Sequence, residues 1–353
     1  MNDIELKWIK EIPHTAYREV PNDFIRLDLA VNKHPLSQKV IQSLKSNLNK
    51  VNEYPDTNWS ILVKKIADYN KVSEKQILIS NGLEEAIDII TRAFVRKGEK
   101  VLILTPTYSQ FYIAVLRQEA KVVTVEYVEN EDFSIPVEKI KEIAKNEDIK
   151  LTWLCNPNNP TGTVFERQQL VSLIEALDCT VVVDECFYEF CGETSIDLLD
   201  RFGNLIVIRS FSKSFGLAGI RFGYIVTNEE IIDSLLRLRQ PSSVNILAQF
   251  AALASLEDLD YYKTTWDEIR KERENLKKEL QNLGTKVFSS GTNFLYVKIN
   301  DAETVFKKLW NSKIFVFPSW DPEFIGGKKG YLRILVGLPN ENKQLVDTLK
   351  KIL

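Results

Sequence analysis

Short apolar runs alternate with amphipathic helical patterns between about residues 76 and 227, and this alternation constrains the fold more than any other feature. The β-type runs occupy residues 77–80, 101–105, 122–127, 151–155, 180–184, 205–209 and 222–226. Helical stretches such as 83–96 and 166–177 lie between them. Strands that alternate with helices form a mostly parallel sheet with helices on both faces. We therefore predict an α/β protein with a seven-stranded, mostly parallel sheet between helices.

The rest of the chain predicts a smaller second unit. Residues 228–283 are nearly all helical in pattern, and after Gly284 the order becomes strand, helix, strand, strand, helix, at 293–299, 302–310, 314–317, 331–336 and 340–352. This order is typical of a smaller α+β domain. We expect an N-terminal arm over residues 1–40, a large domain over 41–245 and a small C-terminal domain over 246–353.

Composition and charge exclude several classes of function. The 353 residues are 44% hydrophobic and 27% charged, which is ordinary for a globular protein, and the net charge of −3 is spread along the chain. No block of one sign marks a nucleic-acid or anionic-membrane partner, and no apolar run reaches the roughly 18 residues of a membrane helix. We predict a cytoplasmic protein without either partner. The two histidines, His14 and His34, are too few for a histidine-rich metal site or a Ser-His-Asp triad in the main body, and no metal is predicted.

One lysine lies among groups that suit a phosphate-bearing aldehyde. In the segment SFSKSFGLAGIRFG, residues 210–223, Lys213 is flanked by the hydroxyls of Ser210 and Ser212 and followed by Arg221 and several glycines. A desolvated amine forms a Schiff base with an aldehyde, while hydroxyls, a guanidinium and open backbone bind phosphate. Pyridoxal 5'-phosphate carries both groups on one ring, and we predict it as the cofactor.

Two charged residues lie in strands where each needs a partner of opposite charge. Asp184 ends the apolar run 180–184, and Arg333 lies inside the apolar run 331–336. An unpaired buried charge costs several kcal/mol, on the order of a whole domain's stability margin. A protonated pyridine nitrogen would pair with Asp184, and a carboxylate bound bidentately would pair with Arg333. The alternative for an isolated aspartate is a helix cap or a turn residue.

Motifs throughout the chain carry a family resemblance. The Lys213 segment resembles the lysine motif of fold-type I pyridoxal phosphate enzymes, the aspartate aminotransferase superfamily. Further motifs occur in the expected order and resemble most the histidinol-phosphate aminotransferase branch, which includes threonine-phosphate decarboxylase: Glu53-Tyr-Pro-Asp, Ser80-Asn-Gly-Leu-Glu-Glu, Thr105-Pro-Thr-Tyr and Asn156-Pro-Asn-Asn-Pro-Thr-Gly. The resemblance covers nearly the whole chain and implies the fold-type I architecture.

The resemblance also implies a role for each matching residue. Lys213 would anchor the cofactor, Asp184 would pair with its ring nitrogen, and Tyr108 would stack on the ring. Asn159 would donate a hydrogen bond to the cofactor's phenolic oxygen and lie next to the substrate. Arg333 would bind the α-carboxylate of the substrate. The phosphate would be held by the following residues: Gly82, Leu83, Glu84, Ser210, Ser212 and Arg221. Tyr54 would reach the phosphate of the neighbouring subunit's cofactor, and this implies a homodimer with shared active sites. The N-terminal arm would pack on the small domain and on the partner subunit.

The implied activity is an aminotransferase that moves an amino group between an amino acid or an amino-phosphate and a 2-oxo acid, expected to be 2-oxoglutarate. The freed amine of Lys213 would remove the substrate's α-proton and return a proton to the cofactor. Three alternatives stay open: a decarboxylase with the same anchor, a cyclase or lyase, and a cofactor-sensing binding protein. The last is disfavoured, because the sequence shows no N-terminal DNA-binding segment.

Two departures from the branch bear on the substrate. Phe187 stands where its aminotransferases usually have a tyrosine, and Ser243-Val-Asn resembles the decarboxylase. Residues 315–320, FVFPSW, lack the arginine that often binds a substrate phosphate, and this favours an apolar or aromatic amino acid. Side chains that would still offer positive charge lie elsewhere: His14, Arg18, Lys328 and Lys329.

Overall fold

The computed structural model describes residues 9–10, 12–13, 19–57 and 59–353. His14 and Arg18 lie outside the described residues, as does much of the predicted arm. The seven expected strands all form within one sheet: β2 (Ile77–Ser80), β3 (Lys100–Thr105), β5 (Lys121–Glu126), β6 (Ile149–Cys155), β7 (Thr180–Asp184), β8 (Leu205–Ser210) and β9 (Gly223–Val226).

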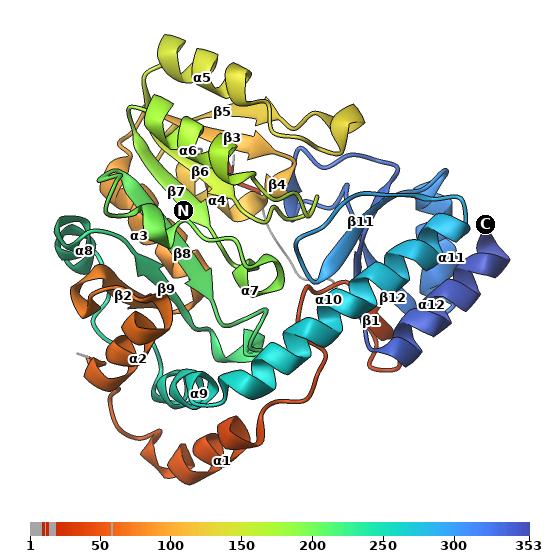
Figure 1. The fold of residues 1–353 in the computed structure, drawn as a ribbon, viewed down its shortest axis with the longest axis horizontal. Coiled ribbons are helices and arrows are strands. Elements are labelled where there is room, and N and C mark those ends of the chain that lie inside the picture. The colour runs from red at the N-terminus through yellow and green to blue at the C-terminus, as the bar shows by residue number, and fades with distance from the viewer. Residues whose placement is uncertain (1–8, 11, 14–18, 58) are drawn as a thin grey trace, which may run out of the picture.

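The sheet has the order β2-β9-β8-β7-β6-β3-β5. The pairs from β8 to β5 are all parallel, while β9 is antiparallel to both of its neighbours. Helices lie on both sides of the sheet (Figure 1). The predicted α/β fold with a mostly parallel seven-stranded sheet is therefore confirmed.

Alternation along the strands separates two cores. In β8, Leu205 and Val207 belong to one buried cluster, whereas Ile206 and Ile208 belong to the other. The second cluster is covered by α3 (Gly82–Phe94), α4 (Ser109–Arg117) and α8 (Glu229–Leu236). The first is covered by α2 (Ser60–Asn70), α5 (Val137–Asn146), α6 (Arg167–Ala176), α9 (Ile246–Leu256) and α10 (Leu259–Asn282). The strands read as continuous apolar runs because both of their faces are buried.

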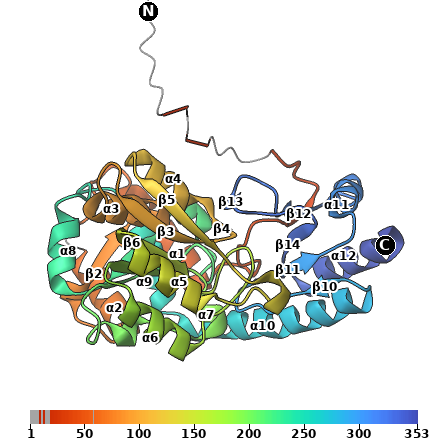
Figure 2. The same ribbon diagram turned by 90° about the horizontal axis from the view of Figure 1, so that it is seen from above.

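A five-stranded sheet forms beside the large one, in the order β1-β12-β14-β11-β10. Its strands and covering helices are β1 (Ile25–Leu27), β10 (Lys286–Val287), β11 (Phe294–Lys298), α11 (Ala302–Asn311), β12 (Ile314–Pro318), β14 (Tyr331–Leu335) and α12 (Pro339–Ile352). Helix α10 runs from the large sheet to the small one (Figures 1 and 2). Strand β1 pairs in parallel with β12. With only three residues, β1 is too short to show the alternation of apolar and polar residues that marks a strand in a sequence.

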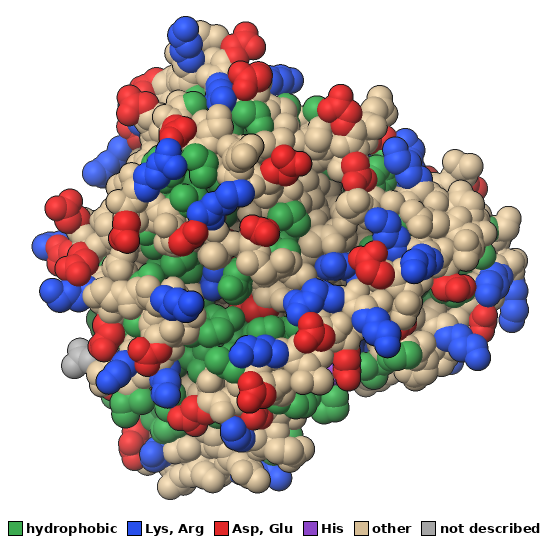
Figure 3. All heavy atoms as spheres, viewed as in Figure 1, with side chains coloured by type: hydrophobic (Ala, Val, Ile, Leu, Met, Phe, Trp, Pro, Cys, Tyr) green, Lys and Arg blue, Asp and Glu red, His purple; other side chains and the backbone are tan. Residues whose placement is uncertain are grey.

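A short two-stranded pairing joins loops of the two sheets. β4 (Thr107–Tyr108), which follows β3, pairs antiparallel with β13 (Phe324–Ile325), which lies between β12 and β14. The remaining helices are α1 (Gln38–Asn47) and α7 (Tyr188–Cys191). Lys, Arg, Asp and Glu side chains are interspersed over the face seen in Figure 3. Among the described residues, no helix combines the length and apolarity needed to cross a bilayer.

Candidate active site

Most of the predicted cofactor-binding residues lie at or just after the ends of strands, at one edge of the large sheet. Asp184 is the last residue of β7, and Ser210 is the last of β8, its parallel neighbour. The loop with Asn159 follows β6, Tyr108 follows β3, and Gly82 follows β2, which runs in the same direction as β8 because β9 is antiparallel to both. Ligands of open α/β sheets collect at this edge.

Asp184 is a buried carboxylate that a cation would stabilise. Its side chain is 4% exposed, and Oδ1 accepts a hydrogen bond of 2.9 Å from the Cys186 backbone N–H. Burial raises the pKa of Asp184 to about 7, while this hydrogen bond and the nearby Lys213 lower the pKa. Because an ionised carboxylate is costly in these surroundings, a bound cation at this position would be strongly favoured.

The loop that carries Lys213 is held from several sides. The Ser212 N–H donates to Ser210 Oγ at 3.0 Å, just before the half-buried lysine. After it, the Ser214 carbonyl accepts hydrogen bonds from Asn32 Nδ2 at 3.0 Å and from Trp266 Nε1 at 2.9 Å. The amine therefore extends from a loop whose backbone is fixed by residues far away in the sequence.

Arg221 forms the positive part of the proposed phosphate cradle. Its Nη1 donates to the Ala218 carbonyl at 3.0 Å and is 3.4 Å from Ser212 Oγ, and its Nη2 forms an ion pair with Glu84. Gly82 begins α3 with a φ of +73°, and a Cβ there would lie 2.6 Å from Arg221 Nη2. Only glycine leaves this cradle open. Leu83 follows it and packs into the core, so its backbone rather than its side chain could face a ligand.

Tyr108 is linked to the same carboxylate. Its hydroxyl donates to Glu84 Oε1 at 3.0 Å, and its ring lies edge-on to Phe111 with 6.0 Å between centroids. Glu84 thus connects the tyrosine predicted to stack on the cofactor ring with the arginine predicted to bind its phosphate.

Arg333 is 2% exposed and lies among aromatic rings. Its Nη1 donates to Asn159 Oδ1 at 2.7 Å, and its Nη2 donates to the Asp28 carbonyl at 2.6 Å. The guanidinium carbon lies 4.7 to 5.4 Å from the ring centroids of Phe317, Phe324 and Phe294. Asn159 and Arg333, predicted from separate motifs, are therefore in direct contact.

Sequence reasoning missed several residues that shape the site. Glu323 Oε1 lies 3.3 Å from Arg333 Nη1, but a lone glutamate in a surface-type loop carries no sequence signal. The buried Glu185 accepts from Arg209 Nε at 3.0 Å and Nη2 at 2.7 Å, so an ion pair ties together the ends of β7 and β8. The adjacent Asp-Glu at 184–185 and Arg-Ser at 209–210 could have indicated this pair.

The residues that depart from the family pattern are placed as follows. Phe187 is buried against Phe294, with 5.3 Å between ring centroids, and offers no hydroxyl. Ser243 Oγ donates to Glu85 Oε2 at 2.9 Å. Lys328 pairs with Glu126 and Glu129, and Lys329 pairs with Glu303. Tyr54 is 90% exposed.

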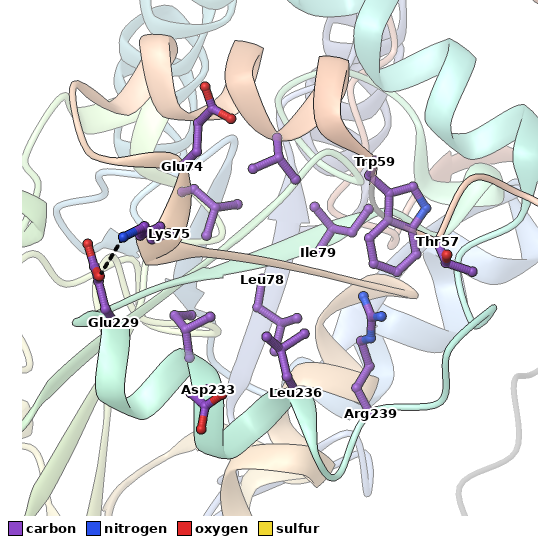
Figure 4. Close-up of a pocket in the computed structure, with 13 residues that line it drawn as sticks. Thr57, Trp59, Glu74, Lys75, Leu78, Ile79, Glu229, Asp233, Leu236 and Arg239 are labelled. Carbon is purple, nitrogen blue, oxygen red and sulfur yellow. Dashed lines mark ion pairs between the residues drawn. The ribbon is translucent and has the colours of Figure 1, made fainter.

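A cavity of about 420 Å³ lies elsewhere, between α2, β2 and α8 (Figure 4). Leu78, Trp59 and Arg239 are among its lining residues, and Lys75 and Glu229 form an ion pair of 3.6 Å at one end. None of the predicted site residues lines it. We place the chemistry at the sheet edge, because that is where the lysine, the buried carboxylate and the two arginines occur.

The arrangement fits pyridoxal 5'-phosphate. Asp184 offers a buried carboxylate for a ring cation, Arg221 and the open Gly82 turn suit a phosphate, and Lys213 supplies the amine for the aldehyde. The fold and the site together define an enzyme that works on amino compounds through this cofactor.

Comparison with known proteins leads to the same class. The chain matches the family "Aminotransferase class I and II" over residues 22–349. It is 37% identical over 349 residues to the histidinol-phosphate aminotransferase of Thermoanaerobacter pseudethanolicus, with 98% of both chains covered. The chain therefore belongs to the class I and II aminotransferases, and it is a pyridoxal phosphate-dependent aminotransferase.

Two solved structures share the fold. The histidinol-phosphate aminotransferase of Clostridium acetobutylicum superposes with a TM-score of 0.86 at 26% identity, covering 93% of this chain and 98% of the other. The enzyme of that name from Sinorhizobium meliloti, in complex with pyridoxal-5'-phosphate, gives a TM-score of 0.89 at 22% identity and covers 100% of this chain and 99% of its own.

Proposed function

We propose that this aminotransferase moves an amino group between an amino acid or an amino-phosphate and a 2-oxo acid, with 2-oxoglutarate as the acceptor. The observation that carries the proposal is the buried Arg333 with Asn159 at 2.7 Å, on the edge where Lys213 and Asp184 also lie. A buried guanidinium with aromatic neighbours suits a carboxylate, the group that amino acids and 2-oxo acids share.

Each residue has a defined task in this proposal. Pyridoxal phosphate supplies an aldehyde for the amino group and a ring that withdraws electrons from the α-carbon. Lys213 would anchor the cofactor, and its freed amine would remove the substrate's α-proton and return a proton to the cofactor's C4' carbon. Asp184 would keep the ring nitrogen protonated, Tyr108 would stack on the ring, and Arg333 with Asn159 would orient the substrate.

Phosphate contacts come from the backbone of residues 82–84 and from the side chains that follow β8. The positive end of α3 favours an anion, and Ser210, Ser212 and Arg221 add donors. Glu84 contributes its N–H, and its carboxylate has to leave Arg221 when a phosphate binds.

Two kinds of amino donor are candidates for this enzyme. The relative named above acts on histidinol phosphate by its name, and this amino-phosphate is the first donor to test. Phe317 next to Arg333 and the surface pairs of Lys328 and Lys329 support an apolar or aromatic amino acid as the competing donor.

A donor panel tests the function. The cofactor-loaded protein is incubated with 2-oxoglutarate and either histidinol phosphate, an aromatic amino acid or an aliphatic one, and glutamate formation is followed. Glutamate from at least one donor, lost in Lys213→Ala, is the expected result. Carbon dioxide without a new oxo compound would instead support the decarboxylase alternative.

We also infer a cytoplasmic homodimer with shared sites, in which residues 1–40, 41–245 and 246–353 form an arm, a large domain and a small domain. Tyr54 is exposed, and three further large apolar side chains in the same stretch are exposed as well: Leu48, Val51 and Ile61. Such clustering is typical of a protein–protein contact. A dimer would bring Tyr54 to the phosphate in the partner's site.

A further inference from the structure

The loop between β12 and β14 brings a carboxylate to the substrate clamp. Glu323 Oε1 lies 3.3 Å from Arg333 Nη1, the nitrogen that also donates to Asn159 at 2.7 Å. Glu323 is 24% exposed, whereas Arg333 is almost completely buried. Solvent therefore has access to the Glu323 side chain but hardly to that of Arg333.

This loop is attached to the site at a second point. The Glu323 carbonyl accepts from the Ser109 N–H at 2.9 Å, and the next residue, Phe324, pairs with Tyr108 in the β13–β4 ladder. A Cβ at Gly327 would lie 1.8 Å from the Ser319 carbonyl oxygen, so the loop folds closely back on itself. The loop backbone thus holds Glu323 beside the clamp independently of its contact with Arg333.

The contact between Glu323 and Arg333 is weak by comparison with the contact that a substrate carboxylate could make with Arg333. It joins one oxygen to one nitrogen at a distance near the limit of a hydrogen bond. A bound α-carboxylate can take two nitrogens in the forked geometry that guanidinium favours. Two carboxylates beside one buried guanidinium repel each other, and Glu323 can turn to solvent because it is partly exposed.

We propose that the Glu323 carboxylate is a built-in competitor for Arg333. Glu323 occupies Arg333 between turnovers and is displaced by the carboxylate of the 2-oxo acid, or of the donor where the donor is an amino acid. The inference rests on the proposed role of Arg333 as the carboxylate clamp. Because the amino acid formed from the 2-oxo acid also carries a carboxylate, Glu323 weakens binding of the 2-oxo acid and helps this product leave. Glu323 is thus a positioning residue that sets KM.

Kinetics of the cofactor-loaded enzyme test the proposal. In Glu323→Gln and Glu323→Ala, KM for 2-oxoglutarate should fall about two- to tenfold while kcat stays the same or falls. The control is Glu175→Gln, which removes a glutamate from an exposed pair with Arg201 far from the site and should leave KM unchanged. An unchanged or raised KM in both Glu323 variants would overturn the proposal.

A binding measurement separates this inference from the proposed function. Glutarate, a carboxylate without an amino group, is titrated calorimetrically into wild type, Glu323→Gln and Arg333→Met. Tighter binding in Glu323→Gln and loss of binding in Arg333→Met are expected. Equal binding by wild type and Arg333→Met would show that Arg333 is no clamp, and both proposals would fail. Binding that requires Arg333 but does not tighten in Glu323→Gln would refute only the role of Glu323.

Discussion

Replacing Asp184 by Asn should stabilise the cofactor-free protein and weaken its hold on the cofactor. Asparagine has the same shape and can still accept the hydrogen bond from the Cys186 N–H. The substitution therefore removes one buried negative charge and little else. If the role of Asp184 is to pair with a ring cation, its charge destabilises the cofactor-free protein and stabilises the cofactor-loaded one.

The magnitude follows from the pKa of Asp184, which burial raises from 3.8 to about 7. Between these values the folded carboxyl stays protonated while the unfolded one ionises, so this group makes wild-type stability fall as pH rises from about 4 to 7. Above pH 7 the loss is complete at about 2–4 kcal/mol. Asparagine cannot ionise, and Asp184→Asn avoids the loss.

Urea unfolding of the cofactor-free proteins at a series of pH values is the assay. Asp184→Asn should match wild type near pH 4 and exceed its free energy of unfolding by about 2–4 kcal/mol at pH 8. Asp233→Asn, in an exposed pair with Arg237, serves as the control and should show no such pH-dependent gain. Equal stability of Asp184→Asn and wild type at pH 8 would refute the argument, as would undiminished cofactor affinity in the loaded variant.

Three further experiments probe the other parts of the site. Gly82→Ala should weaken cofactor binding about tenfold or more in a fluorescence titration, because Gly82 has a positive φ and an added Cβ would approach Arg221. The control is Gly203→Ala, whose Cβ would meet nothing within 4 Å and which should leave cofactor binding intact. Arg333→Lys should raise KM for 2-oxoglutarate about 100-fold without changing the visible spectrum of the cofactor, and an unchanged KM would exclude Arg333 as the clamp. Mixing inactive Tyr54→Ala and Lys213→Ala chains should restore about a quarter of wild-type activity through hybrid dimers, whereas no recovery would mean that sites are not shared.

The large sheet was predictable because its signal is local. Strands 77–80, 151–155 and 180–184 are apolar on both faces, and each is followed by turn residues and a helical pattern. Strand β1 was missed, since three residues that join a sheet through β12, nearly 290 residues later, carry no local pattern. The β4–β13 pairing was missed for the same reason, with two residues on each side.

Residues of the candidate site could be proposed from the sequence where a strand end and a chemically unusual residue coincide. Asp184 and Arg333 stand out because a charge interrupts or ends an apolar run, and Lys213 because hydroxyls and glycines surround it. Glu323 could not be found in this way, because its importance depends on a loop that packs beside Arg333 only in three dimensions. Tyr54 is exposed in its own chain, and the mixing experiment tests its proposed role in the partner's site.

The most direct test of the central claim is to find the lysine that holds the cofactor. The loaded protein is reduced with borohydride, which makes the cofactor linkage permanent, and its peptides are examined by mass spectrometry. The phosphopyridoxyl group should be found on the peptide that contains Lys213 and be absent from Lys213→Ala. Its attachment to any other lysine, or its retention in that variant, would contradict the account.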